Sequence, residues 1–142
     1  MIKRCYFALL ATVALGWLSG CSHSQGPECY PVRGQVTYKG KPLAEAMVVL
    51  HRRDGDVQGA HKPIAYTTAT GRFSVTTAKP GDGARPGEYA ITVELRAPRT
   101  VGEEVVHNGP NLLPAKYALP ASSGLRCVVE QGENELPAIN LL

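Results

Sequence analysis

The sequence predicts an all-β fold, an antiparallel β-sandwich of about seven strands that follows an N-terminal signal helix. From position 32 onward, short segments alternate apolar with polar residues at the period of two that a half-buried strand shows. Glycine and proline residues separate these segments at the spacing that is typical of a sandwich. No stretch after Pro31 has the period of an amphipathic helix. These three observations together indicate the fold class.

The first half of the domain contains four predicted strands. The segment "VRGQVTY" at 32–38 alternates Val32 and Val36 with Arg33 and Gln35, so we expect its valines to face a core. Turn residues such as those of "KGKP" and "ATGR" separate the strands. The other three strands, with the residues expected to point inward, are 46–51 (Ala46, Val48, Leu50), 63–68, and 72–77 (Phe73, Val75).

The clearest strand is "EYAITVELR", which carries Tyr89, Ile91, Val93 and Leu95 on one face. The segment before it, "KPGDGARPG", holds three glycines and two prolines, a composition that excludes a helix or a central strand. The remaining segments are an irregular stretch at 97–124, a strand at 125–130, the turn "QGEN" and a last strand through "LPAINLL".

The N-terminus has the order of an export signal. Lys3 and Arg4 precede an apolar run from Cys5 to Leu18, and small residues follow. The run holds fourteen residues, whereas a helix that crosses a bilayer needs about 20. A cleaved signal is therefore favoured over a permanent transmembrane helix.

The signal ends in "LSGC", which resembles the lipobox of bacterial lipoproteins. The resemblance implies that Cys21 receives the lipid on its sulfur and becomes the N-terminus after residues 1–20 are removed. Several acyl chains hold a protein on a membrane, whereas one chain binds only marginally. An ordinary secretory signal, with Cys21 as a plain thiol, is the alternative. Ser22 stands where an aspartate would retain the protein in the inner membrane, so we expect an outer-membrane lipoprotein that faces the periplasm.

Three regions follow from this interpretation. Residues 1–20 are a signal peptide, 21–31 are a polar, proline-containing tether, and 32–142 are one β-sandwich domain. Because Lys3 and Arg4 leave with the signal, the formal charge falls from +3 to +1. No basic cluster remains, so nucleic acid is not an expected partner.

Export also permits a disulfide between the two remaining cysteines, Cys29 and Cys127. Cys127 shares an alternation face with Leu125 and Val129, so a small core residue is the other interpretation. In that case Cys29 is an unbridged thiol in the tether.

Three segments, "VRGQVTYKGKPLAEAMVVL", "TTATGRFSVTT" and "PGEYAITVE", resemble the carboxypeptidase regulatory-like domain, a β-sandwich of the transthyretin-like, Ig-like kind. The resemblance covers nearly all of residues 32–142 and implies the fold without implying any chemistry. The residues that match the family's habits are Gly34, Val36, Gly40, Pro42, Leu43, the Thr-Gly-Arg-Phe turn before Ser74, Pro86, Gly87 and Tyr89.

The sequence carries no motif of an enzyme or of a cofactor site. The glycine spacing near Gly34 does not fit a P-loop, and no nucleophile elbow is present. The family name suggests a zinc peptidase, but that activity belongs to a separate catalytic domain with paired ligands. His51 and His61 flank one polar segment and are the candidates for a shared zinc or copper ion.

We therefore expect a non-catalytic, lipid-anchored envelope protein that binds an unknown envelope protein or glycan. Its candidate contact segments are the exposed ends of the sandwich at 52–62 and 97–116. Leu112 and Leu113, within the second segment, are expected to cap the core. The alternatives are a structural spacer and a periplasmic metal-binding protein that uses His51 and His61.

Overall fold

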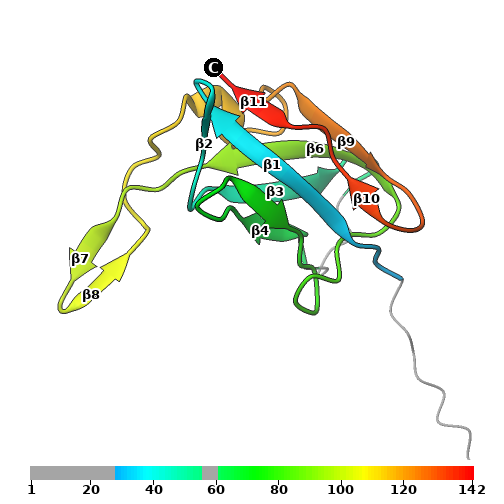
Figure 1. Ribbon diagram of the computed structural model, residues 1–142, viewed down its shortest axis with the longest axis horizontal. Helices are drawn as coiled ribbons and strands as arrows, with labels where there is room; N and C mark the ends of the chain where they lie inside the picture. Colours follow the sequence, from blue (N-terminus) through cyan, green and yellow to red (C-terminus); the bar gives the residue numbers. More distant parts are fainter. Residues whose placement is uncertain (1–27, 56–60) are drawn as a thin grey trace, which may run out of the picture.

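Two β-sheets face each other across an apolar core in the computed structural model, which describes residues 28–55 and 61–142 (Figure 1). The signal segment 1–20, Cys21 and most of the tether lie outside the described residues. The helical content of the described part is a 3₁₀ turn, η1 (Ala115–Ala118). No helix in these two ranges is long and apolar enough to span a bilayer.

The first sheet is built around one central strand. This strand has antiparallel partners along one edge and parallel partners along the other. Val36 turns its main-chain groups toward Gly71 and Leu43 on the antiparallel side, and Leu136 donates to the Arg33 carbonyl on the parallel side. The strands are β1 (Val32–Tyr38) at the centre, β2 (Lys41–Pro42) and β5 (Arg72–Ser74) on one edge, and β10 (Asn134–Glu135) and β11 (Ile139–Leu141) on the other.

The second sheet has four strands and is antiparallel throughout. Its order, from edge to edge, is β4 (Ile64–Tyr66), β3 (Met47–Arg52), β6 (Gly87–Glu94) and β9 (Leu125–Val129). The strand β3 buries alternate residues, and β6 does so except at Thr92, which is also buried although it belongs to the outer face. Because β9 is the last strand in this order, it forms one free edge of the sheet.

The core between the sheets contains the residues that the alternation predicted to face inward. The Cβ position of Gly34 lies only 2.7 Å from the Phe73 ring, so a side chain on β1 would collide there. Predicted core residues that are at most 4% exposed are Val32, Val36, Ala46, Val48, Leu50, Phe73, Val75, Tyr89, Ile91 and Val93. The all-β sandwich prediction is thus confirmed.

The two long edges of the sandwich differ. On one edge, Ile64 and Thr76 exchange two main-chain hydrogen bonds of 2.9 and 2.8 Å, which join the sheets. On the opposite edge β9 and the β10–β11 segment lie side by side without any strand pairing between them in the described part of the chain. The sandwich is therefore closed along one side and open along the other.

Three predicted details were wrong. The described residues form eleven strands rather than about seven, because several are only two or three residues long. The C-terminal strands pair parallel with β1, so the sandwich is not purely antiparallel. The stretch 97–124 contains a hairpin, β7 (Arg99–Val101) and β8 (Glu104–Val106), which projects away from both sheets (Figure 1).

Of the two leucines expected to cap the core within 97–116, one does so and the other does not. Leu113 is 6% exposed and joins the core, as predicted, but Leu112 is 56% exposed. Adjacent residues in extended backbone point to opposite sides, so only one of the pair can turn inward.

Candidate binding groove at the open edge of the sandwich

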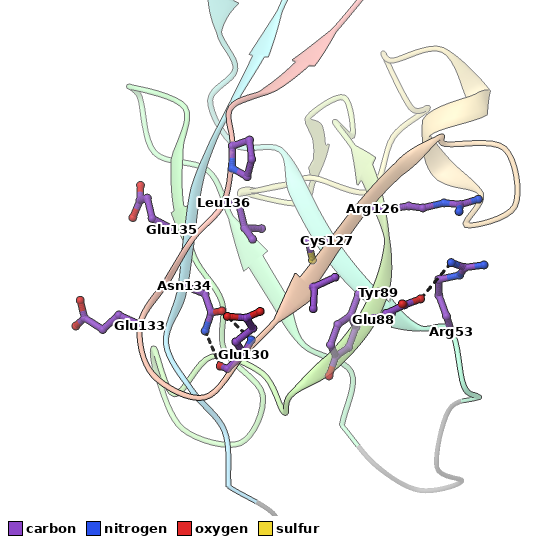
Figure 2. A pocket seen from close by; sticks show the side chains of 12 residues that line it. Arg53, Glu88, Tyr89, Arg126, Cys127, Glu130, Glu133, Asn134, Glu135 and Leu136 are labelled. Carbon is purple, nitrogen blue, oxygen red and sulfur yellow. Dashed lines mark hydrogen bonds and ion pairs between the residues drawn. The ribbon is translucent and has the colours of Figure 1, made fainter.

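The open edge forms a groove between β9 and the β10–β11 segment (Figure 2). It consists of two adjoining hollows of about 600 Å³ and about 250 Å³. We describe the two hollows as one groove because four of their lining residues are common to both. These residues are Arg126, Cys127, Leu136 and Pro137.

The floor of the groove is apolar. Figure 2 places the Cys127 thiol and the Leu136 side chain between the two strands, where β9 and β10 diverge. Leu125 and Ile139 extend this floor into the smaller hollow. Burial raises the pKa of Cys127 to about 11, so its thiol is uncharged at neutral pH. The floor therefore offers an uncharged surface to a bound group.

One wall of the groove is a strand edge with free main-chain groups. The Glu88 carbonyl in β6 accepts a hydrogen bond from the residue that follows β3, so Glu88 turns toward β3. Because this direction alternates along a strand, Tyr89 turns toward β9, where its partner is Cys127. Arg126 and Val128, on either side of Cys127, therefore direct their N–H and C=O groups outward from the sheet.

A side chain ends this free edge at the β9–β10 turn. The Asn134 amide nitrogen donates to the Glu130 carbonyl at 3.0 Å, and the Glu130 N–H donates to the Asn134 side-chain oxygen at 2.9 Å. The side chain of Asn134 thus satisfies Glu130 in the way that a paired strand would. On the opposite wall Pro137 has no N–H to offer.

Charged residues line the rim. Glu88, Glu133 and Glu135 each lie within 4 Å of an arginine, at 3.2, 3.7 and 3.2 Å respectively. Arg126 in β9 and Glu130, the residue after β9, are both exposed and have no ionic partner among the described residues. The outer face of β9 therefore presents a cation and the exposed Val128, and an anion follows where the strand ends.

The structure has no disulfide between Cys29 and Cys127, which the sequence left as one of two possibilities. Cys29 and Cys127 both remain thiols in the described part of the chain. Burial, followed by the charge of Asp82, raises the pKa of Cys29, which places this thiol beside the turn at 77–83. Cys127 instead lies opposite Tyr89 in the second sheet.

The two candidate metal-binding histidines have different surroundings. His51 Nε2 lies 2.9 Å from the Thr92 hydroxyl on the outer face of the second sheet, whereas His61 is exposed. Within 28–55 and 61–142, no group of three or more metal-binding side chains comes together. The metal-binding alternative therefore gains no support from the geometry.

In their described parts, the two predicted contact segments contribute one residue to the groove, because Arg53 lines the larger hollow. Positions 56–60 of the segment 52–62 lie outside the described residues. Side-chain contacts hold the first residues of this segment. Arg52 donates to both carboxylate oxygens of Asp54 and stacks 5.7 Å from the centre of the Tyr89 ring. The segment 97–116 forms the projecting hairpin and η1 begins within it.

Sequence reasoning missed the groove because its walls come from two sheets. The order β9, turn, β10 looks like a simple hairpin in the sequence. In the structure the two strands enter different sheets. The only local signals are Pro137, which interrupts the last predicted strand, and Asn134 in the turn "QGEN".

By its fold the chain is an all-β sandwich protein with an open edge. No protein-family model matches the sequence. No curated protein matches it either. Among solved structures, a DUF3823 family protein from Parabacteroides merdae is similar, with 16% sequence identity and a TM-score of 0.39. The similarity covers 79% of this chain and 45% of that chain, so this chain spans less than half the length of that protein.

Proposed function

We propose that this chain is a non-catalytic, lipid-anchored protein of the bacterial cell envelope, and that the groove at its open edge is its binding surface. The lipid is attached at Cys21, and the domain is a carboxypeptidase regulatory-like sandwich. One observation supports the binding role: the groove combines an apolar floor with a strand edge whose main-chain groups have no partner in the described chain. Binding sites typically pair a concave apolar surface with a few polar groups of fixed direction.

The groove is favoured over the two segments that the sequence suggested. Unpaired strand edges attract other chains, so natural proteins usually cover them or make them charged. Here Val128, at the middle of the free edge, is 56% exposed and apolar. Among the described residues of the hairpin, Val101 and Val105 are also exposed, but they line neither of the two hollows of the groove.

The position of the tether keeps such a partner close to the membrane. The Pro31 carbonyl accepts a hydrogen bond of 2.9 Å from the N–H of Asn134, so the chain enters the domain beside the groove. The segment 21–31 spans at most about 40 Å when it is fully extended. We therefore expect the groove to meet molecules that are themselves bound to, or lie near, the same membrane.

The anchoring part of the proposal is tested on the N-terminus of the protein from membranes. We expect mass spectrometry to find a peptide that begins at Cys21 and carries the mass of the lipid. The variant Cys21→Ala should move the protein to the soluble fraction, whereas the matched variant Cys29→Ala should stay in the membrane fraction. An unlipidated wild-type protein that fractionates as soluble would overturn the anchoring.

The binding part is tested by site-specific photocrosslinking in intact cells. A photoreactive amino acid replaces Val128 or Pro137 in the groove, and Lys41 on the opposite edge serves as the control position because it is also exposed. We expect the same adduct from both groove positions and none from position 41. A spacer module predicts no adduct specific to the groove, and that result would contradict the binding role whatever the class of the partner.

A further inference from the structure

We propose that the groove takes an extended peptide segment, which adds to β9 as a fifth, antiparallel strand of the second sheet. This inference rests on the proposed function, because it names the kind of molecule that the groove binds. It also names the groups that recognise this molecule, which are main-chain groups of β9 together with the residues on its two faces.

The free main-chain groups select an extended polypeptide. Arg126 and Val128 each direct one N–H and one C=O outward, at the two-residue spacing of a strand. An added strand meets this pattern with alternate donors and acceptors, which is how sheet edges commonly bind peptides. We infer the antiparallel direction because every pair in this sheet is antiparallel, and antiparallel pairing is slightly more stable.

The length of the edge limits the contact to a short segment. Asn134 already satisfies Glu130, so new pairing ends before that residue. Three peptide residues opposite Arg126, Cys127 and Val128 would then use all four outward groups. The middle residue lies opposite Cys127, on the face that looks into the apolar hollow, and therefore carries an apolar side chain.

Charge selects the residues on the outer face of the added strand. Arg126 and Glu130 have no ionic partner among the described residues, whereas Arg33, Arg52 and Arg72 in the same two sheets are paired. In antiparallel register an acidic residue lies opposite Arg126 and an apolar residue lies opposite Val128. A basic residue just before the paired segment then reaches the Glu130 side chain. The segment therefore reads basic, any residue, apolar, apolar, acidic from its N-terminus.

The test uses the lipidated protein in detergent micelles and a random library of peptides of about ten residues displayed on phage. We expect the selected peptides to contain the pattern above. The double exchange Arg126→Glu with Glu130→Arg should reverse the signs of the charges that are selected. Failure to select any peptide, or selection of peptides without a charge preference, overturns this inference.

The strand geometry is tested on the best selected peptide with two matched variants. Val128→Pro removes one outward N–H and leaves the β6–β9 ladder intact, because that ladder uses Cys127 and Val129. We expect it to weaken binding about tenfold, as the loss of roughly 1.4 kcal/mol implies. Val128→Thr keeps the N–H and should bind within about threefold of wild type. Equal affinity for both variants overturns strand addition.

Two further measurements separate the possible failures. N-methylation of the peptide residue that faces Val128 should abolish binding, and N-methylation of the next residue toward the peptide C-terminus should not. If no peptide binds but groove-specific adducts of a glycan or lipid form in cells, the peptide inference fails and the proposed function stands. Sedimentation without peptide tests whether the protein self-associates through β9. If wild type self-associates and Val128→Pro does not, a second copy is the occupant and the inference is overturned.

Discussion

At the scale of single residues, Asp82 fixes the conformation of the turn at 77–83, a segment rich in glycine and proline. Its carboxylate accepts main-chain N–H bonds from Thr77 at 2.6 Å and from Ala78 and Lys79 at 2.9 Å. Burial acts to raise the pKa of Asp82, but these hydrogen bonds outweigh it, and the pKa lies below its usual value. The ionised carboxylate therefore stabilises the folded state.

Replacing Asp82 tests this role. We expect Asp82→Asn to lower the free energy of unfolding by about 1–3 kcal/mol near neutral pH, because one carbonyl oxygen replaces a charged acceptor of three bonds. Since the folded pKa is lowered, the contribution is present above the unfolded pKa of about 3.9 and is lost as pH falls through the folded pKa. The difference between wild type and variant in urea unfolding should thus shrink in acid.

The matched control is Asp54→Asn. Asp54 forms an ion pair with Arg52, but its side chain is 64% exposed. We expect this variant to lower the free energy of unfolding much less than Asp82→Asn does, because water screens an exposed ion pair. A larger loss in Asp54→Asn than in Asp82→Asn would contradict the assignment of the turn to Asp82.

At the scale of elements, the β7–β8 hairpin differs from every other strand pair in the described chain because it contributes nothing to the core. Its two strands are exposed at nearly every position. At its base the two arms join each other, where Gly109 donates to the Ala97 carbonyl at 2.9 Å and Ala97 donates to Pro110 at 3.0 Å. Beyond the base, Leu112 donates to the Leu95 carbonyl at 2.8 Å, which attaches the segment to the body. An isolated two-stranded ribbon is only marginally stable in water.

Deleting the hairpin should therefore leave the sandwich intact. We expect replacement of residues 99–106 by two glycines to change the free energy of unfolding by no more than about 0.5 kcal/mol. Leu113→Ala, just beyond the hairpin base, should instead cost about 2–5 kcal/mol because Leu113 is buried. Chemical denaturation of the wild type and the two variants measures these free energies of unfolding. Comparable decreases in both variants would mean that the hairpin is part of the folding unit.

At the scale of the whole molecule, the sandwich is held together by pairing between distant parts of the chain rather than by a covalent link. The last strands pair with the first, and Tyr30 exchanges two main-chain hydrogen bonds of 2.8 and 3.0 Å with Ala84. Cys29, next to Tyr30, and Cys127 remain thiols. Main-chain hydrogen bonds thus hold the described end of the tether, at Tyr30 and Pro31, on the domain.

Thiol counting checks this property. We expect the protein from membranes, denatured without a reducing agent, to expose two titratable thiols, Cys29 and Cys127, because the proposed lipid blocks the Cys21 sulfur. Reduction before the titration should leave the count unchanged. A count that rises from zero to two on reduction would show the disulfide that the sequence permits.

The sequence predicted the core better than it predicted the edges of the sheets, because the two depend on different information. Alternation is local, so Val48, Leu50 and Ile91 were placed correctly from their own neighbours. Edge pairing is not local: β1 and β11 pair in parallel although about a hundred residues separate them, and no residue pattern near either strand shows it. The groove depends on such edges, and its floor residue Cys127 was predicted either as a core residue or as the disulfide partner of Cys29, not as part of a groove.

Under the proposed lipid anchoring, many copies of this protein share one membrane, and Asn134 then limits how their open sheet edges can pair. Lipid anchors concentrate molecules in two dimensions, where open sheet edges stack into aggregates most readily. By closing the Glu130 end of β9, the amide of Asn134 leaves an edge of only two outward residues. So short an edge is long enough to hold a bound segment and too short to start a growing cross-β stack.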